Sequence, residues 1–368
     1  MPTETQCRIA LTFIPQIGDV VARHLAEHFG DAASIFSAPR RELERIPNVG
    51  PSRADAIRQF RDFTRTEAEI RFLEHHKITP LFWTENDYPA RLRHCWDAPV
   101  LLYARGRMDL HAPRMLGVVG TRRPSAYGTE CCRALVAGLA PLQVTIVSGM
   151  AYGIDITAHQ AALEAGLPTI GVLAHGHDKL YPAAHARIAR QMLEQGGLLS
   201  DFPSGTPLNR MHFPRRNRIV SGCCDGILVI ESGITGGSLI TADLANSYNR
   251  DVLAVPGRVG DDRSAGCLTL IRQHKAALVT SADDIAEAMN WHTPALKPPS
   301  PVQTALFNEL DPDQRRILDT LGTERLSMDE VQYRSGIPRS RVAEVVLGLE
   351  MMGILKAMPG HTFQHLGS

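Results

Sequence analysis

Four stretches of the sequence are rich in glycine, in arginine or in hydroxyl side chains, residue types that suit a phosphate group. Residues 120–125 read Gly-Thr-Arg-Arg-Pro-Ser, and guanidinium groups hold phosphate oxygens in pairs. Residues 148–155 and 231–241 are rich in glycine, which lets a backbone lie close to an anion and leaves N–H groups free at the start of a helix. Residues 213–219 contain three arginines and no acid. The residues predicted to contact phosphate are Gly120, Thr121, Arg122, Arg123, Ser125, Ser148, Gly149, Arg216, Asn217, Arg218, Gly237, Ser238 and Thr241.

Other side chains in these stretches have simpler interpretations. The basic run also fits a solvated helix end that begins near Pro214. Asp155 and His159, four positions apart, could form an acid–base pair, but a helix cap and a hydrogen-bonded histidine are more common, and we assign both a structural role. His175 and His177 offer two imidazoles with no third ligand nearby. We therefore predict no catalytic residue, no metal site and no cofactor.

The composition and the absent motifs exclude several classes of protein. The chain has 368 residues, and its 39 Lys and Arg balance its 39 Asp and Glu, which excludes a globally basic nucleic-acid binder. The cations are 34 Arg and five Lys, a bias that codon usage also explains. No Gly-Lys pair occurs, which excludes a P-loop nucleotidase. Gly117 and Gly120 do not have the G-x-G-x-x-G spacing of a dinucleotide site.

Targeting and membrane signals are not visible in the sequence. Arg8 and Pro15 interrupt the first apolar run. The uncharged stretch 134–154 contains a proline and three glycines, which fits a helix, a turn and a buried strand better than a membrane span. The seven cysteines include no C-x-x-C and give no disulfide framework. We expect a cytoplasmic protein with no membrane partner.

Residues 83–290 alternate short runs of Val, Ile and Leu with helical stretches, which is typical of a parallel sheet covered on both faces. The predicted strands are Met115–Val119, Val144–Val147, Thr169–Leu173, Gly197–Ser200, Gly226–Ile230, Val252–Val255 and Ala277–Thr280. The predicted helices are Tyr127–Leu139, Ile156–Ala165, Ala186–Gln195 and Leu239–Tyr248. The expected fold class is α/β, with a Rossmann-like doubly wound parallel sheet that binds ligands at the carboxyl ends of its strands.

A helical region, residues 1–82, precedes this core and contains an internal repeat. Ile14-Pro-Gln-Ile-Gly18 recurs 32 positions later as Ile46-Pro-Asn-Val-Gly50, which predicts two copies of a helix, turn and helix unit similar to the helix-hairpin-helix motif. Acidic and basic residues nearly balance in this region. A scaffold or protein contact is therefore weighed above direct contact with DNA.

Two further regions follow the core. Residues 291–304 are rich in proline and predict a linker. Residues 305–368 have the pattern of a winged helix, with an S-x-x-E capping box at Ser327–Glu330, an apolar face from Val342 to Met352 and a two-stranded wing. Seven basic and nine acidic residues in this region oppose the approach of phosphate, which favours a contact with protein.

Short motifs in a fixed order extend through the core. They are Tyr88-Pro89 with Leu92, Pro99, Leu102-Tyr103, Gly106, Val119-Gly120-Thr121-Arg122, Ser148-Gly149, Gly153-Ile154-Asp155, Ala158-His159, Tyr181-Pro182, Arg216-Asn217-Arg218-Ile219, Gly237-Ser238-Leu239-Ile240-Thr241 and Val255-Pro256-Gly257. Together they resemble the DNA-processing protein A family (DprA, also called Smf). The resemblance implies a Rossmann-like core that binds single-stranded DNA, forms a homodimer and helps to load a RecA-type recombinase in natural transformation and recombination.

The sequence departs from the family pattern at cationic positions. Tyr152 stands where many relatives have Arg, and Ala183 stands where many have Lys. We therefore expect Arg122, Arg216 and Arg218 to clamp the phosphates of the strand. Two alternatives remain at this point: a nucleotide-processing hydrolase on a related scaffold, although the acid of its Gly-rich loop is displaced here, and an interaction scaffold that binds no nucleic acid.

Overall fold

A computed structural model of the chain describes residues 2–291, 310–322, 324–351, 354–358 and 362–365. The chain divides into two units, Met1–Thr293 and Pro294–Ser368. Apart from Trp291, the linker predicted at 291–304 lies outside the described residues.

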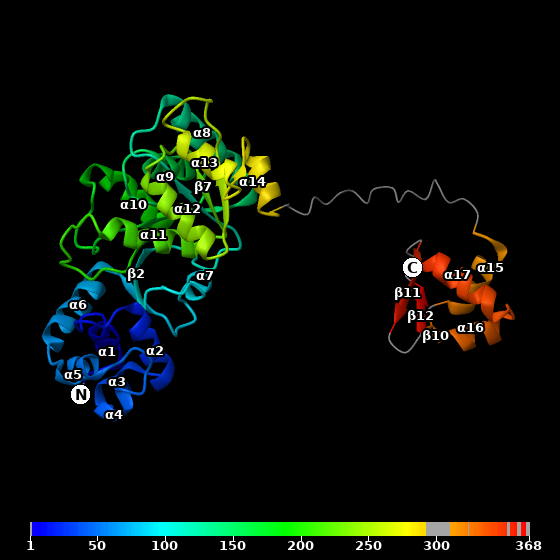
Figure 1. Cartoon of the computed structure of the whole chain (residues 1–368), viewed down its shortest axis with the longest axis horizontal. Coiled ribbons are helices and arrows are strands. Elements are labelled where there is room, and N and C mark those ends of the chain that lie inside the picture. The colour runs from blue at the N-terminus through cyan, green and yellow to red at the C-terminus, as the bar shows by residue number, and fades with distance from the viewer. Residues whose placement is uncertain (1, 292–309, 323, 352–353, 359–361, 366–368) are drawn as a thin grey trace. The chain divides into compact units, whose positions relative to one another are not determined.

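The first unit begins with a group of helices that contains the repeated Ile-Pro-x-x-Gly sequence (Figure 1). These helices are α1 (Glu4–Leu11), α2 (Asp19–Phe29), α3 (Ala32–Ser37), α4 (Arg40–Leu43), α5 (Pro51–Gln59) and α6 (Phe63–His76). Gly18 and Gly50 are the N-cap residues of α2 and α5, both with extended backbone. The equivalent residues Ile14 and Ile46 are both buried. The two copies therefore place the same positions in one core.

A nine-stranded sheet forms the centre of the first unit. Its strands are β1 (Thr79–Phe82), β2 (Leu101–Gly106), β3 (Met115–Val119), β4 (Thr145–Gly149), β5 (Thr169–Val172), β6 (Gly196–Ser200), β7 (Gly226–Val229), β8 (Asp251–Ala254) and β9 (Ala277–Leu278), in the order β1-β2-β6-β5-β4-β3-β7-β8-β9. The strands from β3 to β9 pair in parallel, as predicted, whereas β1 and β2 pair antiparallel. From β3 the chain adds β4, β5 and β6 on one side, and it then adds β7, β8 and β9 on the other side. The order therefore reverses between β3 and β7, and a doubly wound sheet binds its ligands at such a reversal.

Helices cover both faces of this sheet. They are α7 (Ala90–Arg93), α8 (Ala126–Gly138), α9 (Ile154–Glu164), α10 (Ala186–Glu194), α11 (His212–Cys223), α12 (Gly237–Ser247), α13 (Ala265–Arg272) and α14 (Ala282–Ala288), with 3₁₀ turns at Ala140–Leu142 and Ala183–His185. Leu116 and Val118 of β3 pack in the cluster under α8, α9 and α14, while Met115 and Val119 pack in the cluster under α11, α12 and α13. Adjacent residues of one strand thus serve opposite cores, as the alternation of side chains requires.

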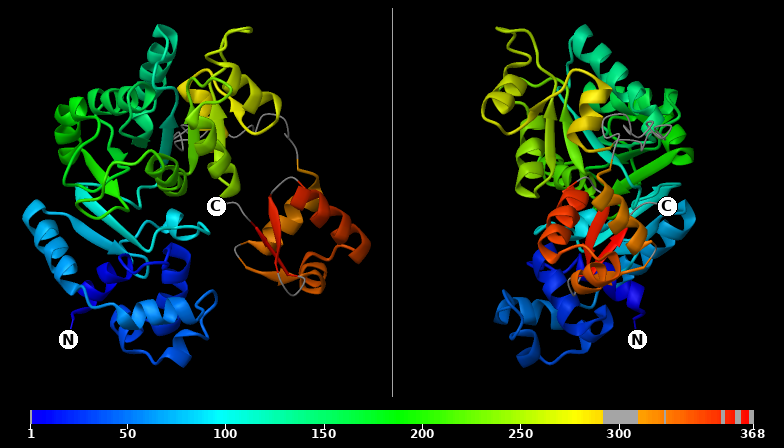
Figure 2. Two further views of the ribbon diagram at one scale, coloured as in Figure 1. Left: turned by 60° about the vertical axis from the view of Figure 1, so that its left-hand side comes forward. Right: turned by 90° about the vertical axis from the view of Figure 1, so that its right-hand side faces the viewer.

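The helical group packs against the antiparallel edge of the sheet. Its apolar cluster includes Phe82 of β1 and Leu101 and Tyr103 of β2. In both views of Figure 2 the cyan strands lie between the blue helices and the green part of the sheet. The sequence did not predict β1 and β2, and residues 79–82, assigned to the helical region, lie in the sheet.

The second unit is a winged helix. Its elements are α15 (Pro312–Leu321), β10 (Leu326–Ser327), α16 (Met328–Ser335), α17 (Arg339–Met351), β11 (Leu355–Met358) and β12 (Thr362–His365). The predicted capping box is present, because the Glu330 N–H donates to Ser327 Oγ and the Ser327 N–H donates to the Glu330 carboxylate. The wing has a third strand, β10, in addition to the predicted pair. Met352 and the turn at 359–360 lie outside the described residues.

Candidate functional site

A cavity of about 740 Å³ opens at the carboxyl ends of β3 and β4, beside the starts of α11 and α12. All four predicted stretches contribute to its lining. The predicted residues that line it are Gly120, Thr121, Arg122, Gly149, Arg216, Asn217, Gly237, Ser238 and Thr241. The cavity therefore lies at the reversal point of the sheet, as the strand order leads us to expect.

Arg216 is the buried cation of this cavity. Its side chain projects from α11, and Nη1 donates to the Val172 carbonyl at 2.9 Å. Among the described residues, Nε has no hydrogen-bond partner. A Cβ on Gly149 would lie 1.9 Å from Nη1 and 2.4 Å from the Asp155 carboxylate, so only glycine lets the cation and the acid approach each other there. Burial lowers the pKa of Arg216, but its ordinary value is so high that the side chain stays charged.

Arg122 supplies a second, exposed cation. Its guanidinium carbon lies 5.3 Å from the centre of the Phe213 ring, a cation–π contact that orients an otherwise mobile side chain. The Phe213 and Tyr181 rings are 6.1 Å apart and tilted by 65°. Arg210 also lines the cavity. The rim of the cavity therefore combines positive charge with aromatic faces.

Buried polar bonds hold the loop that carries Arg122. Ser125 caps α8 by accepting from the Gly128 N–H at 3.0 Å, and its hydroxyl donates to the Glu231 carboxylate at 2.5 Å. The Thr121 N–H donates to the Glu231 carbonyl at 2.7 Å. Gly153 has φ of 80°, and a Cβ there would lie 2.3 Å from the Thr121 carbonyl. The end of β7 and the start of α9 thus fix both sides of this loop.

His159 has the structural role predicted for it, whereas the prediction that Asp155 caps α9 is wrong. His159 is fully buried and is hydrogen-bonded through both ring nitrogens, to Thr169 Oγ1 at 2.7 Å and to the Gly149 carbonyl at 2.8 Å. Burial lowers the pKa of His159 to about 4, so the ring is neutral. Gly153, rather than Asp155, is the N-cap of α9. Asp155 accepts from the Ala151 N–H at 3.3 Å and lines the cavity, and burial raises its pKa.

The start of α12 also faces the cavity. Gly236 is its N-cap, and no side chain caps this end. Gly233, Gly236 and Gly237 line the cavity, and the Ser238 hydroxyl donates to Ser232 Oγ at 2.8 Å. The positive end of a helix dipole therefore points at the space beside the two arginines.

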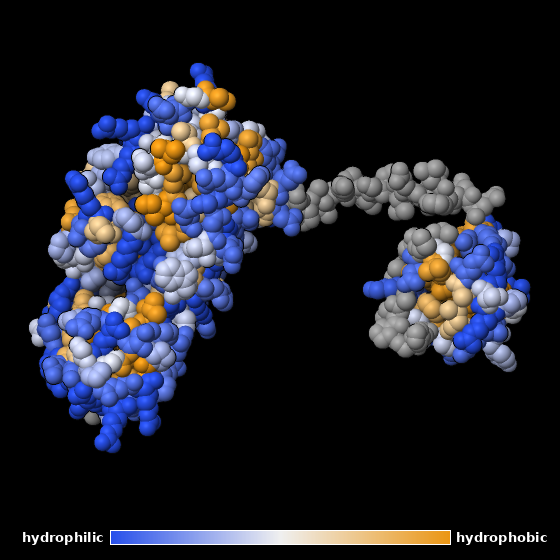
Figure 3. Space-filling model, viewed as in Figure 1, coloured by the Kyte–Doolittle hydropathy of each residue, from blue (hydrophilic) through white to orange (hydrophobic). Residues whose placement is uncertain are grey.

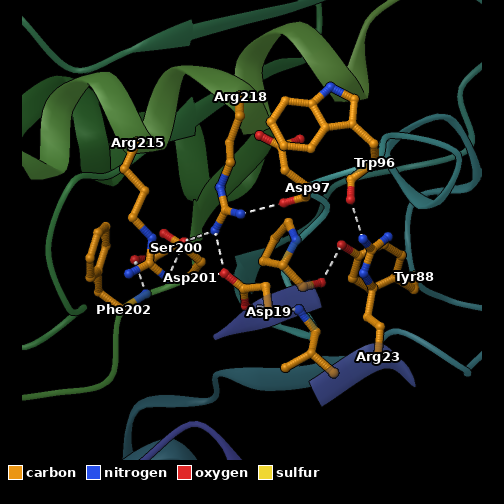
Figure 4. A network of polar contacts seen from close by, with 12 residues as sticks. Asp19, Arg23, Tyr88, Trp96, Asp97, Ser200, Asp201, Phe202, Arg215 and Arg218 are labelled. Atoms are coloured by element: carbon orange, nitrogen blue, oxygen red, sulfur yellow. Dashed lines mark hydrogen bonds and ion pairs between the residues drawn. The ribbon is translucent and has the colours of Figure 1, made fainter. Parts of the chain in front are cut away.

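Arg218 does not share this cavity, and its prediction as a phosphate clamp is wrong. Its guanidinium forms ion pairs with Asp201 at 2.7 Å and Asp19 at 2.9 Å, and it also donates to the Asp97 carbonyl (Figure 4). Positions 216 and 218 are about 200° apart around a helix. The two arginines therefore point to different sides of α11, one into the cavity and one toward the helical group.

Three other predicted residues lie outside the lining. Ser148 is buried, and its hydroxyl donates to the Val118 carbonyl at 2.6 Å, so this residue joins β4 to β3. The Ser125 hydroxyl caps α8 and donates a hydrogen bond to Glu231. Arg123 is exposed next to Arg122.

The described residues contain no group of three His, Cys, Asp or Glu side chains placed to hold a metal ion. His175 accepts from the Tyr181 N–H at 3.1 Å through Nε2, while His177 Nε2 lies 2.9 Å from the Tyr103 carbonyl. Both imidazoles are therefore held by backbone groups. Within the described part of the chain, no helix is long and apolar enough to cross a membrane.

Sequence reasoning missed several residues that shape the site. Phe213 and Tyr181 lie within two of the sequence motifs, but they were not predicted to line the cavity. Glu231 holds the first loop, and its position at the end of β7 was the available signal. Asp19 and Asp201 bind Arg218 on the side of α11 that faces away from the cavity. No sequence pattern indicated this pairing, because neither acid is near Arg218 in the sequence.

Comparison with known proteins assigns all three parts of the chain. Family models match residues 79–290 (DNA recombination-mediator protein A), 293–361 (DprA winged helix domain) and 9–70 (helix-hairpin-helix motif). The protein Smf of Escherichia coli is 37% identical over 304 residues, covering 80% of this chain and 79% of Smf. The DNA processing protein DprA of Streptococcus pneumoniae is 38% identical over 243 residues, covering 66% of this chain and 85% of that protein.

Two solved structures are similar to the chain. The crystal structure of Streptococcus pneumoniae DprA has a TM-score of 0.67 and 32% identity, and the match covers 78% of this chain and 98% of that one. The Helicobacter pylori DNA processing protein A, described for its single-stranded DNA binding mode, has a TM-score of 0.53 and 27% identity, covering 59% of this chain and 97% of that one.

The fold and the cavity define a Rossmann-like protein with an arginine- and glycine-lined cavity, together with helix-hairpin-helix and winged-helix parts. The chain belongs to the DNA recombination-mediator protein A family, DprA or Smf, and has a role in DNA processing and recombination.

Proposed function

We propose that the cavity binds the phosphate backbone of single-stranded DNA. The observation that carries this proposal is that Arg122 and Arg216 line one cavity, in which the one acidic lining residue is Asp155, beside Arg216. Three arginines, Arg122, Arg210 and Arg216, and the uncapped end of α12 surround a space whose lining contains one acid, Asp155. The single-stranded DNA binding mode of the Helicobacter pylori relative supports the assignment.

The rim of the cavity also suits nucleobases. Tyr181, Leu208 and Ile240 line it and are about half exposed. Figure 3 shows apolar surface among charged surface in the region of α9, α11 and α12. Unpaired bases stack on such surfaces irrespective of sequence, whereas bases within a duplex are not available for stacking. We therefore infer a preference for single strands over duplexes and a weak base preference.

The hydrolase alternative lacks its acid at the required place. Asp243, the carboxylate that follows the Gly-rich loop, is exposed, lies outside the cavity lining and forms an ion pair with Lys275 at 3.0 Å. Asp155 remains the acid in the lining, next to Arg216. We propose a binding protein rather than an enzyme, and release of free base from a nucleoside monophosphate by the purified chain would reverse this conclusion.

Three finer proposals follow from membership of the family. We propose that the chain helps to load a RecA-type recombinase on single strands during recombination and natural transformation, that it acts as a homodimer, and that it does so in the cytoplasm. Two cavities on one strand would raise avidity without new contacts. Co-sedimentation of the chain with a RecA-type protein, and sedimentation equilibrium of the chain alone, test the first two.

The test of DNA binding is fluorescence anisotropy with a 20-nucleotide dT strand and a duplex of equal length, at 50 to 300 mM salt. Each phosphate neutralised on a single strand contributes roughly −0.7 to the slope of log K against log salt. Replacing both Arg122 and Arg216 with Ala should therefore make the slope less steep by about 1.4. Arg107→Ala is the matched control, because Arg107 is 81% exposed and lies outside the cavity lining. An unchanged slope in the double variant contradicts the proposal.

A further inference from the structure

Helix α11 is held from the side opposite to the cavity by a cluster of four charged residues. Arg218 forms ion pairs with Asp201 and Asp19, and Arg215 forms ion pairs with the same two acids at 3.2 and 3.3 Å. Figure 4 shows both arginines extending from one helix toward these acids. The cluster is balanced in charge, and the side chains of Asp201 and Arg218 are almost completely buried, 1% and 8% exposed.

Asp19 brings the helical group into this cluster. It is the first residue of α2, while Arg218 belongs to the core. Its Oδ2 accepts from Arg218, and its Oδ1 accepts from the Val100 N–H at 3.2 Å. One carboxylate thus joins the first hairpin, the chain just before β2, and α11.

The internal repeat shows that the hairpin does not itself require this acid. Asp19 follows Gly18 in the first copy, whereas Pro51 follows Gly50 in the second. Both copies fold, with Gly18 and Gly50 as equivalent N-cap residues. An acid at the first helical position is therefore a property of the copy that faces α11.

We propose that Asp19 is a positioning residue for the DNA site, which it serves by fixing α11 so that Arg216 stays over Gly149. This inference rests on the proposed function of the cavity. Arg216 has one hydrogen bond, to the Val172 carbonyl, and its Nε is unpartnered among the described residues. The Asp155 carboxylate attracts the guanidinium from the other side of Gly149, and the orientation of α11 determines whether Arg216 can stay there. A binding group displaced by about 1 Å loses much of its effect.

Asp19→Asn is the sharpest variant, because the amide keeps the shape and the Oδ1 acceptor for the Val100 N–H but removes the charge. We expect about a tenfold loss of affinity for the dT strand, with a salt slope less steep by about 0.7, the value for one phosphate. Asp55→Asn is the control, since Asp55 pairs with Arg40 at 3.2 Å on the surface of the helical group and such pairs contribute little.

A double-variant cycle separates positioning from a general loss of stability. If Asp19 acts through Arg216, then adding Asp19→Asn to Arg216→Ala should change affinity less than twofold, because the group that it positions is already gone. An equal loss in both backgrounds overturns the proposal. So does an Asp19→Asn variant that binds as tightly as Asp55→Asn.

Hydrogen exchange tests the same contact without DNA. The amides of residues 212–223 should exchange faster in Asp19→Asn than in wild type or Asp55→Asn, and equal rates overturn the proposal. If Asp19→Asn does not fold, then Asp19→Glu replaces it, because this variant keeps the charge and moves it by one methylene. Its affinity for the dT strand is measured in the wild-type and Arg216→Ala backgrounds, and its hydrogen exchange is measured over residues 212–223. Wild-type protein that binds no strand at any salt concentration overturns the proposed function instead, and exchange alone then decides whether Asp19 holds α11.

Discussion

The arginines of the core cavity and Arg341 of the winged helix have different surroundings. Arg122 and Arg216 of the core face a cavity in which Asp155 is the one acidic lining residue. Arg341 of α17 instead forms ion pairs with three acids, Asp311, Asp313 and Glu344. The difference lies in how many acids surround each of these particular cations, and a count of arginines alone cannot show this. The comparison favours the cavity of the core over α17 as the proposed site of phosphate binding.

The largest expected effect is a charge reversal at Arg122. Because this side chain is exposed, Arg122→Glu should fold normally, and it replaces a phosphate contact with repulsion. We expect about a hundredfold loss of single-strand affinity, since one charge-assisted contact is lost and one repulsion is added. Anisotropy at 100 mM salt measures it. Arg315→Glu, on the exposed surface of the winged helix, should change affinity less than twofold, and a similar loss there would break the comparison.

Acid should destabilise the core through His159. Its pKa is 6.5 in the unfolded chain and about 4 when buried, so between these values the unfolded chain binds a proton that the folded chain does not. Stability is therefore lost as pH falls, by about 2 kcal/mol from this group at pH 5. Urea unfolding at pH 7.5 and 5.0 measures it by tryptophan fluorescence, because Trp83, Trp96 and Trp291 all belong to the first unit.

His159→Gln is the paired variant for that measurement. It should reduce the difference between the two pH values by about 2 kcal/mol. His111→Gln, at an exposed position, should leave the difference as it is. An unchanged pH dependence in His159→Gln would mean that the ring is not held neutral in the folded core.

A methyl group at Gly149 should displace Arg216. The added Cβ would lie 1.9 Å from Nη1 of Arg216, so the guanidinium must move. We expect about a tenfold loss of single-strand affinity, the loss of one charge-assisted contact. Gly348→Ala in α17 is the control, because the nearest atom to its Cβ is 3.9 Å away. Equal affinities in both variants would show that Arg216 does not contact the strand.

The smallest expected effect comes from releasing Arg341. Asp311→Asn combined with Asp313→Asn removes two of its three acids, and Asn at position 311 still caps α15. We expect duplex affinity at 50 mM salt to rise about twofold, with little change for single strands, because one exposed cation adds one phosphate contact. A large rise would mean that the acids of the winged helix suppress a real DNA site.

The sequence predicted the parallel part of the fold because its signals are local. Each strand from β3 to β8 is a short, largely buried apolar run, and the turns and helices between them follow from glycine and periodicity. The antiparallel pair was missed for a different reason. β1 contains Pro80, and its partner β2 begins 19 positions after β1 ends, at Leu101, so neither strand carries a hairpin signal.

The site was predictable as far as it depends on loops at one edge of the sheet. Arg122 and Arg216 meet because parallel strands end together and α11 packs beside them. Arg218 could not be placed correctly, because its partner Asp19 is 199 residues away and belongs to the other side of the helix. Successive residues of a helix project about 100° apart, so the arginines of a basic run face different neighbours. The acids on each side determine which of these arginines form ion pairs.

The antiparallel strands have a consequence for dissecting the chain. β1 pairs with β2, and β2 pairs with β6, so the backbone ladder continues from the parallel sheet into residues 79–82. A fragment that starts at residue 83 lacks β1, so the β2 amides that pair with β1 would be left without partners beside exposed apolar side chains. Such an edge strand promotes aggregation. One that starts at Thr79 preserves the ladder, and fragments meant to isolate the DNA-binding core should begin no later than that residue.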